Sequence, residues 1–439
     1  MIRLLLMLAA TALFAALPAR ADIEIQEITT ETGIEAWLVE EPSIPFVALE
    51  IKFRGGSVID PEDKLGATNL MSALLNEGAG DLDARAFERE KDALAVSISS
   101  RVNRDALSVS SRFLTENREE SVALLRAVLT EPRFDEDAIE RVRARVLSSL
   151  ASDMTDPQAL AGAASDSLLY AGHPYANPVR GTVESVAELS RDDLVAAHRR
   201  AIIRDGIYVS AVGDITAAEL SALLDALFDG LPESTADLPE ETDPFLPGGV
   251  KVVDFETPQT VIRFAQPGMS RDHPDFFAAF ILNHILGGGG FESRLMQEVR
   301  AKRGLTYGIY TYHSGASYAQ VWAGGTSTAN HRVAETVEVI REEWARLRDE
   351  GISAEELENA KTYLTGAYPL RFDGNSRIAS IAVNMQFDDM PADYIATRND
   401  KVNAVTLEEI NRVAREWLDP ELLTFVLVGQ PEGIEPTIN

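Results

Sequence analysis

The sequence predicts an α+β protein of two homologous domains, each a mainly antiparallel sheet with helices packed on it. Three observations support this prediction. A chain of 439 residues is too long for a single hydrophobic core. An acidic, proline-rich segment divides the chain at residues 231–249. The same order of strand-like and helix-like patterns appears on both sides of that segment.

The dividing segment has the composition of a linker. Residues 231–249 contain four prolines and five acidic residues, and they contain no lysine or arginine. Proline stiffens the chain and interrupts helices and strands, so we expect little regular structure here. This places an N-terminal domain at residues 22–230 and a C-terminal domain at residues 250–439.

Both domains are expected to begin with a strand, a turn containing glycine and an apolar-faced helix. Alternating apolar and polar residues indicate the strands, and apolar residues spaced three to four apart indicate the helices. Two further strands and two long amphipathic helices follow, and a helix and a buried strand close each domain. The first domain has these patterns at residues 45–53, 65–75, 121–129, 135–153 and 207–213, and the second at 260–265, 276–286, 333–348, 354–370 and 423–429.

The first 21 residues have the pattern of a secretory signal peptide. Arg3 precedes an apolar run at residues 4–17, and Ala19-Arg20-Ala21 has the small residues of a cleavage site. The run is too short to span a bilayer comfortably. Because the chain has no cysteine, a lipid anchor on cysteine and a disulfide framework are both excluded. We therefore expect a periplasmic or secreted protein without a membrane anchor.

The charge balance disfavours nucleic acid as a partner. The formal net charge is −30, and an acidic surface repels phosphate backbones and anionic lipids. Such a surface would attract basic peptides, although solubility alone explains it.

One segment combines four consecutive glycines, a basic helix and a tyrosine. The glycine run predicts a hairpin whose backbone can approach a ligand closely. No Gly-Lys-Ser/Thr follows it, and a helix instead of a strand precedes it, so a phosphate-binding loop is disfavoured. An arginine and a tyrosine follow, seven residues apart. The candidate residues are Gly287, Gly288, Gly289, Gly290, Arg300 and Tyr307.

No catalytic metal or nucleophile motif is present. None of the six histidines lies four residues from another, so no helix face presents two imidazoles to one ion. A Gly-x-Ser-x-Gly motif is absent, and the absence of cysteine excludes thiol chemistry.

The mature chain resembles the insulysin and mitochondrial-processing-peptidase family of inverted zinc peptidases over nearly its whole length. Residues 66–78 are similar to the helix that carries the His-x-x-Glu-His zinc motif of that family, but the motif itself is lost. On this pattern Asn69 and Ala73 replace the two histidines, and Ser72 replaces the water-activating glutamate. The remaining glutamate ligand, on the second long helix, is replaced by Ser149. An amide, two hydroxyls and a methyl cannot perform this zinc chemistry.

The second half keeps the substrate-clamping pattern of the family. Arg300 and Tyr307 correspond to the pair with which the family grips substrate near the zinc. The resemblance also relates the glycine run to the glycine-rich loop of the noncatalytic processing-peptidase subunit, which helps to recognise substrate. An alternative interpretation is structural: Arg300 caps a helix that begins near Glu292, and Tyr307 is a half-buried strand residue.

The resemblance implies a noncatalytic subunit of a zinc peptidase, shaped as a clamshell around a chamber. This chain would hold no cofactor of its own. A partner chain with an intact His-x-x-Glu-His would supply zinc, water and general base, and the substrate would be an extended peptide added to a sheet edge. The main alternative is a non-enzymatic scaffold or peptide-binding protein of the same fold. A third possibility is a homodimeric zinc peptidase with cryptic ligands.

Overall fold

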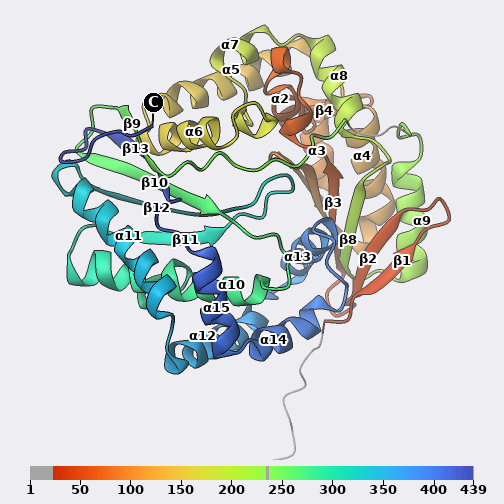
Figure 1. The fold of residues 1–439 in the computed structure, drawn as a ribbon. Coiled ribbons are helices and arrows are strands. Elements are labelled where there is room, and N and C mark those ends of the chain that lie inside the picture. The colour runs from red at the N-terminus through yellow and green to blue at the C-terminus, as the bar shows by residue number, and fades with distance from the viewer. Residues whose placement is uncertain (1–22, 234–236, 439) are drawn as a thin grey trace, which may run out of the picture.

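The computed structural model describes residues 23–233 and 237–438 (Figure 1). Two large sheets with helices packed on them dominate this part of the chain, which confirms the predicted α+β class. The signal peptide expected at residues 1–21 lies outside the described residues. None of the helices formed by the described residues is long and apolar enough to cross a membrane.

The first sheet has six strands in the order β1-β2-β8-β3-β7-β6. Strands β2 and β8 are parallel, and every other neighbouring pair is antiparallel. A separate two-stranded sheet pairs β4 with β5. The strands are β1 (Gln26–Thr29), β2 (Glu35–Glu40), β3 (Phe46–Arg54), β4 (Gly78–Ala79), β5 (Leu82–Asp83), β6 (Ser97–Val102), β7 (Ala106–Leu114) and β8 (Ile207–Gly213).

The second sheet repeats five strands of the first. Its order is β11-β12-β10-β13-β9, with β13 and β9 as the parallel pair. The series β2-β8-β3-β7-β6 therefore matches β9-β13-β10-β12-β11 in both order and direction. This match confirms the prediction of two homologous domains. The strands are β9 (Gly249–Asp254), β10 (Gln259–Pro267), β11 (Ile309–His313), β12 (Val321–Ala329) and β13 (Thr424–Gly429).

Local sequence signals begin several of the helices. Helices α8, α9, α12 and α15 each start with a capping box, in which a serine or threonine and an acidic residue three positions later satisfy the free backbone amides. The helices of the first half are α2 (Ala67–Leu74), α3 (Ala84–Leu94), α4 (Arg118–Thr130), α5 (Glu136–Asp153), α6 (Pro157–Leu169), α7 (Val183–Glu188), α8 (Arg191–Ala201) and α9 (Ala217–Phe228). Between α9 and β9 the described residues form neither helix nor strand.

The helices of the second half match the expected positions with small shifts at their ends. The helix expected at 354–370 stops at Gly366, and a 3-10 turn at Tyr368–Arg371 follows. Pro369 explains the difference, because it has no amide hydrogen to continue the helix. The helices are α10 (Phe276–Asn283), α11 (Val333–Glu350), α12 (Ala354–Gly366), α13 (Asn375–Phe387), α14 (Tyr394–Ala404) and α15 (Leu407–Trp417).

The two halves exchange one helix each (Figure 1). Helix α13 of the second half packs on β3 and β8 of the first sheet, and α6 of the first half packs on β10 and β13 of the second sheet. In β3, Leu49 and Ile51 face the core formed with the helices of the same half, whereas Ala48 packs against Ala379 of α13. Because side chains alternate along a strand, α13 covers the opposite face of that sheet.

Small residues and polar contacts hold the exchanged helices in place. Ala161 of α6 packs with Val261 and Val428 of the second sheet. In the first sheet, Ala379 of α13 packs with Ala48 and Val212. At the end of α13, Gln386 Oε1 accepts a hydrogen bond from the amide of Val209 at 2.9 Å. Lys52 Nζ donates to Asn384 Oδ1 at 2.6 Å, and Arg54 Nη2 donates to the carbonyl of Phe387 at 2.9 Å. The exchange therefore fixes the two sheets relative to each other.

We expect leucine in place of Ala379 or Ala161 to destabilise both halves together. Each alanine is fully buried between a helix of one half and the sheet of the other, and overpacking of such a site costs about 1–3 kcal/mol. Denaturant unfolding followed by tryptophan fluorescence and by circular dichroism should shift to lower denaturant as one transition. Ala396→Leu, at an exposed position on α14, is the matched control. Two separate transitions, with only one of them shifted, would contradict the interlocked arrangement.

Candidate functional site

The glycine run does not form the predicted hairpin. Helix α10 continues as a π-helix at His284–Gly288, and a 3-10 turn at Gly290–Glu292 follows. Gly287 is buried, and a Cβ atom there would lie 2.5 Å from Thr311 Oγ1 of β11. The hairpin prediction is therefore wrong, because the missing side chain serves close packing of a helix on a strand.

The other three glycines differ in their surroundings. A Cβ atom on Gly288 would lie 2.7 Å from Asn283 Nδ2, and one on Gly289 would lie 2.7 Å from the carbonyl oxygen of His284. A side chain at Gly289 would therefore clash with backbone, whereas one at Gly288 would press on the end of the Asn283 side chain. Gly290 is exposed, has a φ of +61° and has open space around its Cα. Of the four, Gly290 has the backbone most able to approach a ligand.

Arg300 lies in the last turn of a second π-helix, Met296–Lys302. Its guanidinium carbon is 4.5 Å from the ring centre of Phe291, whose side chain is 64% exposed. Within residues 23–233 and 237–438 the Arg300 side chain makes no hydrogen bond or ion pair. The arginine is therefore positioned by stacking, and its donors stay available to a ligand.

Tyr307 projects into solvent from the turn before β11. The side chain is 87% exposed, and β11 begins only at Ile309. Thr306 explains both facts, because its hydroxyl bonds to the amide and the carbonyl of Gly308 and holds a tight turn. The alternative interpretation of Tyr307 as a half-buried strand residue is therefore wrong.

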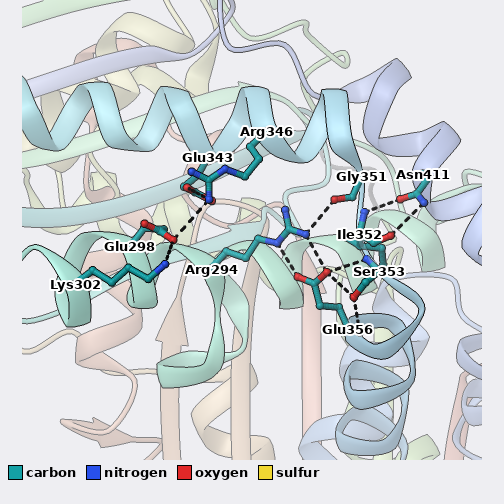
Figure 2. A network of polar contacts seen from close by, with 10 residues as sticks. All are labelled: Arg294, Glu298, Lys302, Glu343, Arg346, Gly351, Ile352, Ser353, Glu356 and Asn411. Atoms are coloured by element: carbon teal, nitrogen blue, oxygen red, sulfur yellow. Dashed lines mark hydrogen bonds and ion pairs between the residues drawn. The ribbon is translucent and has the colours of Figure 1, made fainter.

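Buried acids hold the helix that carries Arg300 (Figure 2). Glu298 is 7% exposed and accepts hydrogen bonds from Lys302 at 2.5 Å and from Arg303 at 2.6 Å. Arg346 of α11 lies 3.6 Å from Glu298 and 2.9 Å from the buried Glu343. Sequence reasoning missed this network, since only the spacing of Glu298 and Lys302 gives a local signal.

A second anchor joins the start of the same segment to α12. Arg294 forms two hydrogen bonds with Glu356, at 2.8 and 3.0 Å, and a third with the carbonyl of Gly351 at 3.0 Å (Figure 2). Glu356 also closes the capping box of α12 with Ser353. The carboxylate that caps one helix therefore also fixes the segment that carries the Arg300 and Tyr307 pair.

The network changes the pKa of its central carboxyl. Burial alone would raise the pKa of Glu298, but hydrogen bonds from Lys302 and Arg303, together with their charges, lower it to about 2. By contrast, burial raises the pKa of Glu343. Glu298 is therefore the carboxylate on which the bracing depends at neutral pH.

The positions of the lost zinc motif lie on two helices in contact. Asn69, Ser72 and Ala73 belong to α2, which packs on α5, and Ser149 belongs to α5. Ser72 is buried and its carbonyl accepts a hydrogen bond from Ser100 at 2.7 Å. These side chains do not fit a zinc ion, because they offer no imidazole, thiolate or carboxylate.

A salt bridge lies beside the same positions. Arg180 donates to Ser149 Oγ at 2.5 Å and forms an ion pair with Asp153. Across the described parts of the chain, no three His, Asp or Glu side chains gather closely enough to hold a metal ion. The polar side chains at these positions bind one another and stabilise the fold. The hydrogen-bond donors of Arg300, in contrast, have no partner within the described residues.

Two family models match consecutive parts of the chain. Residues 36–183 match "Insulinase (Peptidase family M16)", and residues 188–364 match "Peptidase M16 inactive domain". Together they include most strands of both sheets.

Similar proteins agree with these matches. The "Non-peptidase homolog YmxG" of Helicobacter pylori is 26% identical, with 89% of this chain and 90% of that protein covered. The "Probable mitochondrial-processing peptidase subunit beta" of Schizosaccharomyces pombe is 23% identical over 92% of this chain and 91% of its own. A crystal structure of a peptidase M16 inactive domain from Pseudomonas fluorescens superposes with a TM-score of 0.87 and 27% identity, covering 94% of this chain and all of that one.

We expect Glu298→Gln to destabilise the protein in a pH-dependent manner. The folded-state pKa lies below the ordinary value of 4.5, so the carboxylate stabilises the fold above pH 4.5 and loses this effect as pH falls towards 2. Allowing for screening by solvent, the difference in unfolding free energy should be about 2 kcal/mol at pH 6. It should shrink at pH 3 in denaturant titrations. Glu292→Gln, at an exposed position, is the control, and a difference independent of pH would contradict the assignment.

Restored ligands should bind zinc if α2 and α5 keep the family geometry. We expect a variant with Asn69→His, Ala73→His and Ser149→Glu to bind one zinc ion per chain, since the two imidazoles would lie one helical turn apart. Arg180→Gln is included, because Arg180 would otherwise pair with the new carboxylate. Metal analysis and a zinc-dependent rise in Tm are the measurements. Asn69→His with Arg180→Gln is the control, and equal zinc content in both proteins would reject these positions.

Proposed function

The chain belongs to the insulinase family, peptidase family M16, and we propose that it serves there as the noncatalytic subunit of a zinc peptidase. One observation carries the proposal: the zinc-ligand positions hold residues that cannot bind zinc, whereas a braced segment presents the exposed Tyr307 and a half-buried Arg300 whose donors are unused. The similarity to a non-peptidase homologue supports the same assignment.

The missing chemistry would come from a second chain. We propose a homologous partner with an intact His-x-x-Glu-His, which would hold zinc and supply the attacking water and the general base. Similarity to a probable processing-peptidase subunit supports a heteromeric assembly. With the export signal expected at residues 1–21, the assembly would act in the periplasm or outside the cell.

The residues of this chain would bind and polarise the peptide. The Arg300 guanidinium offers planar donors to peptide carbonyls or carboxylates. The Tyr307 hydroxyl can donate to the oxyanion that develops on the scissile carbonyl. Such donors act best when they need no reorganisation, and the Glu298 and Arg294 contacts supply that rigidity. The substrate is an extended peptide held largely through its backbone.

We expect Arg300→Gln and Tyr307→Phe each to lower kcat/KM of the purified two-chain complex at least about tenfold, from lost transition-state contacts. Cleavage of a quenched peptide measures this. Arg145→Gln and Tyr363→Phe are the matched controls at exposed sites. Chelators should abolish activity of the complex, and this chain alone should be inactive.

Two outcomes would reject the proposal. Peptidase activity of the single chain that resists chelators would show that no zinc-bearing partner is needed. Unchanged turnover in the Arg300 and Tyr307 variants, with altered assembly or stability, would favour the scaffold alternative.

A further inference from the structure

A cavity of about 200 Å3 opens beside Tyr307 on the face of the second sheet. It lies between β10, β12, the start of β11 and the first turn of α6, the helix that the first half contributes. Tyr307, which is 87% exposed, forms part of its wall, and Gly325 of β12 lies opposite Tyr310. None of its lining residues, all within the described parts of the chain, is acidic. The other side chains that line it include Gln158, Gln259, Arg263, Thr306 and Ser327.

The walls of this cavity have an excess of hydrogen-bond donors. Arg263 Nη1 donates to the Tyr310 hydroxyl at 2.8 Å, so the proton of that hydroxyl remains free to donate elsewhere. Ser327 Oγ likewise accepts from Gln158 Nε2 at 3.0 Å and keeps its own proton. Arg263 Nε is buried without a hydrogen-bond partner among the described residues. That unpaired donor is destabilising, and the hydroxyl protons of Tyr310 and Ser327 are the donors that the cavity walls offer to a ligand.

Gly325 allows this arrangement. A Cβ atom there would lie 3.0 Å from the Tyr310 hydroxyl and 3.4 Å from Arg263 Nη1. The missing side chain therefore lets the Arg263 and Tyr310 pair lie across β12. Asp166 forms an ion pair with Arg104 and also interacts with the charge of Arg263. Two arginines therefore share one carboxylate, and the site keeps a net positive charge.

We infer that this cavity is a substrate subsite for a carboxylate, carried by an acidic side chain or by the C-terminus of the peptide. The inference rests on the proposed function, because Tyr307 is both the proposed oxyanion donor and a wall of the cavity. A guanidinium with two hydroxyl donors prefers an anion to a neutral carbonyl. At about 3.3 Å per residue of extended chain, the carboxylate would lie within about two residues of the scissile bond. The net charge of −30 disfavours acidic peptides at long range, so any preference for them must be local.

Peptide binding to the mature chain alone tests the subsite without the partner. The probes are fluorescein-labelled, C-terminally amidated decapeptides with one Glu placed at each position in turn, the same peptides with Gln, and a Gln peptide with a free C-terminal carboxylate. In fluorescence anisotropy, at least one Glu peptide or the free-carboxylate peptide should bind about tenfold more tightly than its neutral counterpart. The series separates the two sources of carboxylate.

Variants assign the preference to the cavity. Arg263→Gln should abolish the difference between charged and neutral peptides, Tyr310→Phe should reduce it about threefold, and Arg263→Lys should retain part of it. Arg377→Gln, at an exposed arginine on α13, should leave it unchanged. Circular dichroism and Tm of each variant report folding, and Tyr310→Phe keeps the ring if Arg263→Gln proves unstable.

The subsite and the proposed function can fail separately. Equal binding of Glu, Gln and free-carboxylate peptides, or a preference that survives Arg263→Gln, would overturn the subsite even if Arg300→Gln lowers turnover of the complex. A carboxylate preference that depends on Arg263 would support the subsite even if Arg300→Gln and Tyr307→Phe left turnover unchanged, in which case the proposed function fails.

Discussion

Each half of the chain covers a face of the sheet that the other half builds, and the rest of the structure depends on this exchange. Helices α6 and α13 can pack this closely because Ala161 and Ala379 add almost no bulk at the contact. At the end of α13, Gln386 accepts a hydrogen bond from the amide of Val209 on β8, and Arg54 of β3 donates to the carbonyl of Phe387. The second sheet, which carries the Arg300 segment, is thus held against the first by burial and by hydrogen bonds.

The segment that carries Arg300 and Tyr307 also depends on contacts with other elements. It has two stretches of π-helix, a geometry often found at functional sites. Two ion pairs tie the segment to neighbouring helices: Glu298 pairs with Arg346 of α11, and Arg294 pairs with Glu356 of α12. Glu298 also pairs with Lys302 inside the segment. Rigidity of the segment and freedom of its two outward side chains therefore have separate structural causes.

The sequence predicts the duplication, the sheet class and the positions of most helices, because these follow from local periodicity and punctuation. It does not predict the exchange, since an amphipathic pattern in α6 marks an apolar face but not the sheet that receives it. The hairpin predicted for the glycine run is wrong for a similar reason. Glycine disfavours a helix locally, but at Gly287 only a residue without a side chain can pack this closely on Thr311. The sequence does not predict the cavity beside Tyr307 either, because Arg263, Gly325 and Gln158 come together only in the folded chain.

The interlocking of the halves also changes what the connecting segment at 231–249 has to do. If the two halves were independent, the connecting segment would limit the distance between them. Here α6 and α13 already hold the two halves together. A protease nick in that segment would leave two fragments that still co-migrate as one particle. A peptide could enter between widely separated halves only if α6 and α13 both left the sheets that they cover. A route along the outer surface or between subunits breaks fewer contacts and therefore costs less free energy.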